Sequence, residues 1–218
     1  MTSSGRLRTG SRDPRADAGA TPTVTPAVPD RFARAVRQLR ALRPRREIEL
    51  AEVPAPQRLA PHAYALSGVI HGDPRRTSQE EVANGRLILL YDPAEPEPWG
   101  GDLRLVTYVT AELEPELATD PLLPEVGWSW LTDALAAHGA GFTALAGTVT
   151  QTTSTRFGDL AGPPPAADVE IRASWSPMDR SGVPDLEAHA LAWCGLLAST
   201  AGLPPPGVSA LPERRFSG

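Results

Sequence analysis

DVEIRASWS, residues 168–176, decides the fold class, because apolar and polar side chains alternate through it without a break. One side of this stretch is apolar, with Val169, Ile171, Ala173 and Trp175. The other side is polar, with Glu170, Arg172 and Ser174. Alternation of this kind predicts a strand with one face in the core and the other in water, which is typical of antiparallel sheets.

Further segments of extended character lie on both sides of this one. They are residues 47–53, 60–71, 85–91, 102–113 and 142–153. The segment 85–91 is nearly continuous in apolar residues, whereas 142–153 is rich in Thr, a residue favoured in strands. The polar segment 72–84 is expected to be a loop.

Three segments have helical spacing instead. The first begins at Pro29 and Asp30, with Asp30 as the expected N-cap, and ends at Pro44. Its apolar residues share one side, and its outer face is basic, with Arg34, Arg37 and Arg40. The second helix starts near Asp120 or Leu123 and ends at Gly139, with a stripe of Val126, Trp130, Leu131 and Ala134. The third runs from Pro184 to Gly202, with an inner face of Leu186, Ala190, Trp193 and Leu197.

The order of these elements predicts an α+β fold. We expect an antiparallel sheet of about five to six strands packed with three helices, in the order α-β-β-β-α-β-β-α, with a possible extra N-terminal strand. Short connections bearing Pro and Gly favour antiparallel neighbours over parallel ones. Residues 29–203 form the predicted single domain. Residues 1–28 are predicted to be a disordered basic tail and 204–218 a Pro-rich disordered tail.

Charge is divided unevenly along the chain. Residues 1–46 hold eleven Arg against three Asp, whereas the rest is strongly acidic, and Lys is absent throughout. Such asymmetry is typical of an interaction tail or of a basic arm that docks on its own acidic body. The acidic body would repel a polyanion, so nucleic acid is not the expected partner.

Several classes of protein are disfavoured by composition. The single Cys, Cys194, excludes an intrachain disulfide and is expected to be buried. No secretory signal and no stretch long enough to span a membrane is present, so we expect a cytoplasmic protein without a membrane partner. The four His residues lack the spacing of metal ligands. No catalytic residue, metal or cofactor is predicted.

The candidate interaction residues form two groups, the arginine face of the first helix (Arg34, Arg37 and Arg40) and a group around the start of the second helix. Carboxylates are densest here, with Glu112, Glu114, Glu116, Asp120 and Glu125. Paired acids at a spacing of two could carry acid–base chemistry or bind a hard metal. Alternatively, they form a solvated strand end that precedes a helix N-terminus. Trp128 either completes a broad core face or anchors a partner, since aromatic residues dominate interface hot spots.

Long stretches of this chain resemble a known family. PQRLAPHAYALS (56–67), GRLILLYDP (85–93), AELEPELATDPLLPEVGWSWLTDAL (111–135), VEIRASWSP (169–177) and LAWCGLLASTAGLPP (191–205) are similar to an actinobacterial family, domain of unknown function number three thousand. The resemblance covers residues 31–205. It implies an intracellular actinobacterial protein and supplies no reaction, ligand or catalytic residue.

A looser similarity concerns only the order of elements, which is like that of type III secretion chaperones and their stand-alone relatives. Those are small α+β domains, often dimeric, that bind polypeptides, although fold alone does not fix function. We therefore expect a non-enzymatic protein-binding or regulatory module, with a possible homodimer. The alternatives are an enzyme using Glu112, Glu114 and Asp120, or a nucleic-acid-associated factor using the N-terminal Arg arm.

Overall fold

The computed structural model describes residues 28–72, 81–113, 117, 120–162, 166–178 and 184–205. Residues 1–27 and 206–218 lie outside this part of the chain, and so do Glu114 and Glu116. The two predicted disordered tails therefore stay predictions.

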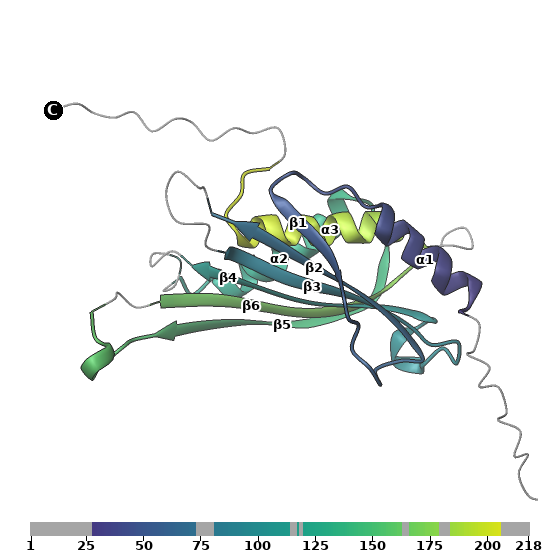
Figure 1. Cartoon of the computed structure of the whole chain (residues 1–218), viewed down its shortest axis with the longest axis horizontal. Coiled ribbons are helices and arrows are strands. Elements are labelled where there is room, and N and C mark those ends of the chain that lie inside the picture. Colours follow the sequence, from purple (N-terminus) through teal and green to yellow (C-terminus); the bar gives the residue numbers. More distant parts are fainter. Residues whose placement is uncertain are drawn as a thin grey trace, which may run out of the picture.

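Six strands and three α-helices make up the described residues. In chain order they are α1 (Asp30–Ala41), β1 (Ile48–Val53), β2 (His62–His71), β3 (Glu81–Tyr91), β4 (Leu103–Leu113), α2 (Leu123–Ala137), β5 (Phe142–Ser154), β6 (Ala166–Pro177) and α3 (Leu186–Thr200). Two short 3-10 turns, η1 (Glu97–Trp99) and η3 (Gly158–Leu160), interrupt connections between strands. This order confirms the predicted α+β class, with the extra N-terminal strand present as β1 (Figure 1).

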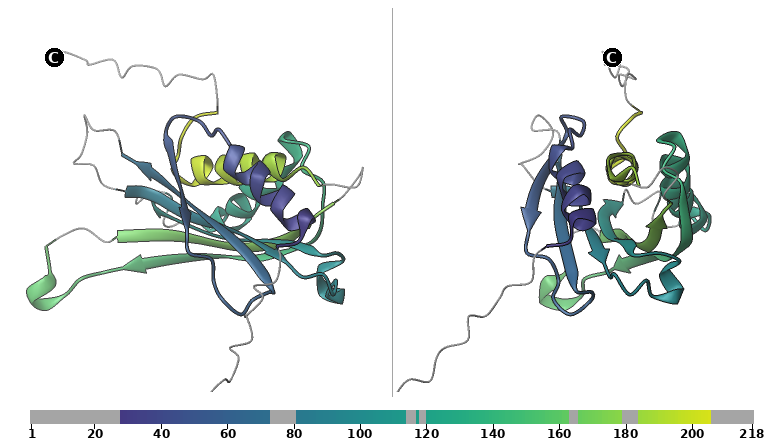
Figure 2. Two further views of the ribbon diagram at one scale, coloured as in Figure 1. Left: turned by 45° about the vertical axis from the view of Figure 1, so that its right-hand side comes forward. Right: turned by 90° about the vertical axis from the view of Figure 1, so that its right-hand side faces the viewer.

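The strands form one antiparallel sheet in the order β1-β2-β3-β4-β6-β5. All three helices lie on the same face of this sheet, and Figure 2 shows the sheet curving around α3. The helix α1 lies on the β1 side of α3, and α2 lies on the β5 side. We call the helix-bearing side the covered face and the opposite side the open face.

The alternation of residues 168–176 is explained by these two faces. Val169, Ile171 and Trp175 are completely buried under the helices, whereas Arg172 on the other side is exposed. The same pattern holds in β4, where Leu105 and Val109 are completely buried. The apolar core therefore lies between the covered face and the helices, as the period of two predicts.

Three local predictions were wrong. The strand β3 begins at Glu81 rather than after Asn84, because Ala83 pairs with Ile70 and is buried. Pro29, not Asp30, is the N-cap of α1, and no side chain caps that helix end. Val126 is 42% exposed, because Gly127 faces the sheet in its place and contacts Val149.

Two tryptophans set the distance between helices and sheet. Trp193 of α3 lies on Gly68 of β2, where an added Cβ would come within 2.8 Å of the indole Cη2. Trp128 of α2 lies on Gly147 of β5, where an added Cβ would come within 2.7 Å of the indole Cζ3. A strand glycine with no side chain to pack permits this close approach of a large ring.

A buried polar pair lies where β6 meets α3. The Trp175 Nε1–H donates to Nδ1 of His189 at 3.1 Å, and both residues are almost completely buried. Burial lowers the pKa of His189 to about 4, so its imidazole is neutral near pH 7. Cys194 is buried as predicted, and burial raises the pKa of its thiol to about 12.

Among the described residues, no helix combines the length and the apolar character that crossing a membrane requires.

A candidate binding surface on the open face

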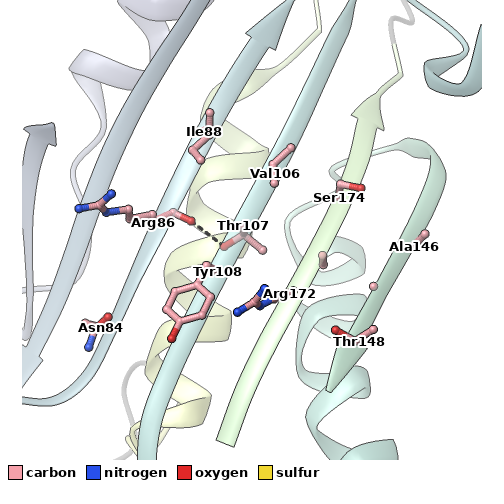
Figure 3. A pocket seen from close by; sticks show the side chains of 12 residues that line it. Asn84, Arg86, Ile88, Val106, Thr107, Tyr108, Ala146, Thr148, Arg172 and Ser174 are labelled. Atoms are coloured by element: carbon pink, nitrogen blue, oxygen red, sulfur yellow. Dashed lines mark hydrogen bonds between the residues drawn. The ribbon is translucent and has the colours of Figure 1, made fainter. Parts of the chain in front are cut away.

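The open face presents its side chains in rows that run across four strands. Each row follows from the strand register, because residues paired across antiparallel strands project on the same side. We name the two central rows separately. The arginine row consists of Arg86, Tyr108, Arg172 and Thr148. The apolar row consists of Ile88, Val106, Ser174 and Ala146. Figure 3 shows both rows with the helices behind the sheet.

The arginine row places an aromatic ring between two cations. The Arg172 guanidinium carbon lies 5.4 Å from the centroid of the Tyr108 ring, and its Nε donates to Glu170 at 2.6 Å. These two contacts hold Arg172 against the sheet, and Figure 3 shows its guanidinium beside Tyr108. Arg86 is exposed and its guanidinium points away from Tyr108 (Figure 3). An anion above this row could be contacted by the Arg86 guanidinium and by the terminal nitrogens of Arg172, whose Nε is already paired with Glu170.

Both rows line a pocket of about 910 Å³. Its wall includes Arg86 and Arg172 but no carboxylate. Ile88, Val106 and Ala146 give one side of the pocket an apolar surface, and Asn84, Tyr108 and Thr148 give the other side hydrogen-bonding groups (Figure 3). The pocket can therefore contact an apolar group and an anionic group at the same time.

Next to the apolar row, Arg104 joins three strands. Its guanidinium donates to the Ala144 carbonyl at 2.9 Å and to the Ser174 and Ser176 hydroxyls at 2.7 and 3.3 Å. Partial burial lowers the pKa of Arg104. Ala144 has a φ of 50° and lies in the bulge where the β5–β6 register shifts. The guanidinium therefore stabilises the irregular start of β5.

A second cavity lies between α2 and α3, on the side away from the sheet. It measures about 620 Å³ and its wall includes Trp130, Ala134, Leu191, Cys194 and Leu203. Trp130 was predicted to be in the core, but it is half-buried and lines this cavity. Arg45 closes one end through a 3.0 Å hydrogen bond to the Pro204 carbonyl.

The acidic residues predicted as a site have separate surroundings. Glu112 is exposed at the end of β4, on the open face, and pairs in register with Asp168. Asp120 accepts a 2.8 Å hydrogen bond from the Leu122 backbone N–H and so stabilises the turn before α2. Glu125 is exposed in the first turn of α2. In the described part of the chain, no group of three His, Cys, Asp or Glu residues could hold a metal ion.

Trp128 is half-buried between α2 and β5, and it contributes to packing against the core. A small cavity of about 380 Å³ lies beside it, with Glu125 and Val149 in its wall. Trp128 therefore combines a packing contact with access to solvent.

Arg34, Arg37 and Arg40 of α1 are exposed, as the helical pattern predicts. Arg40 donates to both carboxylate oxygens of Glu52, at 2.9 and 3.1 Å, and lies 5.4 Å above the Tyr64 ring. This hydrogen bond holds the pKa of Glu52 below its usual value. Figure 2 places α1 and α2 on opposite sides of α3, so these arginines and Trp128 do not form one surface.

These features define a class of protein, an α+β sheet with a helical layer on one face and an open, partly basic face on the other. The model of the family described as Protein of unknown function (DUF3000) matches residues 28–209, so the chain belongs to that family. The resemblance inferred from the sequence is confirmed. No curated protein and no solved structure gives a significant match to the chain.

Proposed function

We propose that this protein is a protein-binding module that holds an acidic polypeptide segment on the open face of its sheet. One observation carries the proposal. The pocket on that face is lined by Arg86 and Arg172 and by no carboxylate, since the Glu170 carboxylate that pairs with Arg172 Nε lies outside the pocket wall, although residues 47–218 as a whole are strongly acidic. A basic pocket on an acidic body attracts acidic partners locally and discourages binding elsewhere on the surface.

The spacing of the arginine row suggests what the segment looks like. Arg86 and Arg172 lie two strands apart, and neighbouring strands are separated by about 4.8 Å, so their anchor points are roughly 10 Å apart. In an extended chain, side chains two residues apart on one side are separated by about 7 Å. Two acidic residues two positions apart, on one side of the segment, can therefore reach both guanidinium groups. An apolar residue beside them would contact Ile88 and Val106.

A random-peptide display selection on the full chain tests this proposal. We expect the selected peptides to carry two acidic residues at that spacing next to an apolar one. For a synthetic peptide of the selected sequence, Arg86→Ala and Arg172→Ala should each weaken binding about tenfold, because each removes a charge-assisted hydrogen bond of roughly 1.4 kcal/mol. Fluorescence anisotropy at low and high salt provides the measurement.

The matched control removes two arginines from α1 instead. Arg34→Ala with Arg37→Ala changes the net charge equally and should leave peptide affinity unchanged, because both side chains lie on the helical side of the sheet. Selected peptides without acidic residues would contradict the proposal. So would equal affinity for the wild-type chain and the Arg86→Ala, Arg172→Ala double variant.

A further inference from the structure

The strand β5 forms one edge of the sheet, and no strand of the described chain lies beyond it. It runs for 13 residues, FTALAGTVTQTTS, without a charged residue or a proline. From Ala146 to Ser154 its pairing with β6 is regular. Natural proteins block exposed edges with charge, proline, bulges or short length, because an open edge recruits another strand. This part of β5 has none of these features.

The opposite edge of the sheet is blocked. The strand β1 has only six residues, two of them Glu, and Pro54 follows it directly. One of these acids, Glu52, is held by Arg40 of α1. The two edges of one sheet therefore differ in the features that prevent strand addition.

Exposed apolar side chains lie at both ends of β5. Phe157 and Leu160, in the turn after its last residue, are 79% and 73% exposed. Met178 is 47% exposed and lies at the start of β5, where its N–H donates to the Gly141 carbonyl at 2.8 Å. Figure 1 shows the β5–β6 hairpin extending beyond the helical layer, so its turn is far from its base.

We propose that β5 pairs with β5 of a second copy of this chain, which joins the two sheets across a twofold axis. Antiparallel pairing of identical strands follows from twofold symmetry. It places the end of each strand beside the start of the other, so Phe157 and Leu160 of one copy approach Met178 of the other. The uncharged strand brings the two acidic bodies together without like charges at the seam.

A second copy fits this edge better than an unrelated strand does. The strand offers Thr at four of its last seven positions, and Thr–Thr pairs across antiparallel strands are favourable. The two apolar ends complement each other only when the strand meets itself in the antiparallel direction. This pairing leaves both open faces accessible, and it is independent of the function proposed above.

Charge placed on the edge tests the pairing. Thr150 and Thr152 face Glu170 and Asp168 across the β5–β6 pairs. In the variant Thr150→Lys with Thr152→Lys, the new lysines lie beside these carboxylates, so β5 stays paired with β6. In the dimer, the lysines of the two copies come close together and repel one another. Sedimentation equilibrium of the full chain should show a wild-type dimer, and the variant should dimerise about tenfold more weakly. Ala51→Lys with Gln57→Lys adds the same charge near β1 and should have no effect.

Crosslinking tests the orientation. A benzophenone amino acid at position 157 should react with Met178 of the other copy, in a mixture of isotope-labelled and unlabelled chains. Within one copy the two residues lie at opposite ends of a hairpin roughly 40 Å long, so that crosslink must join two chains. A wild-type chain that stays monomeric at all concentrations would overturn the proposal. A dimer unaffected by the two lysines on β5 would do the same.

Discussion

The two faces of the sheet are built from the same strands, residue by residue in alternation, and they differ in nearly every physical respect. The covered face is apolar and closed, with Val169, Ile171 and Trp175 completely buried. The open face carries Arg86, Arg104 and Arg172 with hydroxyl groups between them. Burial of the apolar side provides most of the folding free energy, so side chains on the open side can vary with little loss of stability.

The largest expected change in the free energy of unfolding occurs on acidification, and it comes from the covered face. In the folded protein the pKa of His189 is lowered to about 4, whereas in the unfolded chain it returns to its ordinary 6.5. Its contribution to stability is therefore fully present above pH 6.5 and is lost as the pH falls toward 4. The loss is about 1.4 kcal/mol per pH unit, or roughly 3 kcal/mol in all.

Urea unfolding from pH 7 to 4 measures this loss, and His189→Gln provides the control because surface carboxylates titrate in both proteins. The wild-type free energy of unfolding should fall more steeply between pH 6.5 and 4 than that of the variant. If the free energies of unfolding of the two proteins fell in parallel with pH, the pKa of His189 would not be lowered in the folded state.

The next effect concerns the contact between α3 and the sheet. Gly68→Val should lower the free energy of unfolding by about 1–3 kcal/mol, because the added side chain overlaps Trp193 and Leu197. Thermal or urea unfolding measures it, with Gly101→Ala as a neutral control at a glycine with open space around it.

A compensating change sharpens this prediction. In the double variant Gly68→Val, Trp193→Leu, the smaller side chain on α3 should recover part of the stability lost to the new valine. Purely additive losses in the double variant would place the cause outside this contact.

The smallest effect is expected on the open face. Arg104→Ala removes three hydrogen bonds, yet the freed groups can reach water, so the free energy of unfolding should fall by only about 1 kcal/mol. Amide hydrogen exchange should accelerate near Ala144 and remain unchanged in β3. A loss as large as that of Gly68→Val would show that the two faces do not differ as described.

Much of the fold could be predicted from the sequence because the spacing of apolar residues indicates which side chains are buried. The alternation in β6 and the spacing in α3 both depend on a single apolar side, which the sequence displays directly. Val126 was misplaced because Gly127 is the residue that faces the sheet, and a glycine contributes nothing to an apolar stripe. The start of β3 was missed for a similar reason, since Val82 and Ala83 are only two apolar residues between two Glu and an Asn.

The candidate site was harder to predict. Arg172 and Ser174 were placed on the polar side of their strand, but their partners Arg86, Tyr108 and Thr148 come from three other strands. Only the register between strands brings these residues into one row, and the register depends on long-range packing. The acidic stretch was predicted as a site instead because its residues are close together in the sequence.

The strand order also has a consequence for how the protein is made. In the finished sheet β4 pairs with β6 rather than β5, and 52 residues separate the end of β4 at Leu113 from the start of β6 at Ala166. At about 5–20 residues per second, a ribosome takes roughly 3–10 s to synthesise that interval. During this time the edge of β4 that later pairs with β6 has no partner strand. The nascent chain is therefore a candidate client for ribosome-associated chaperones.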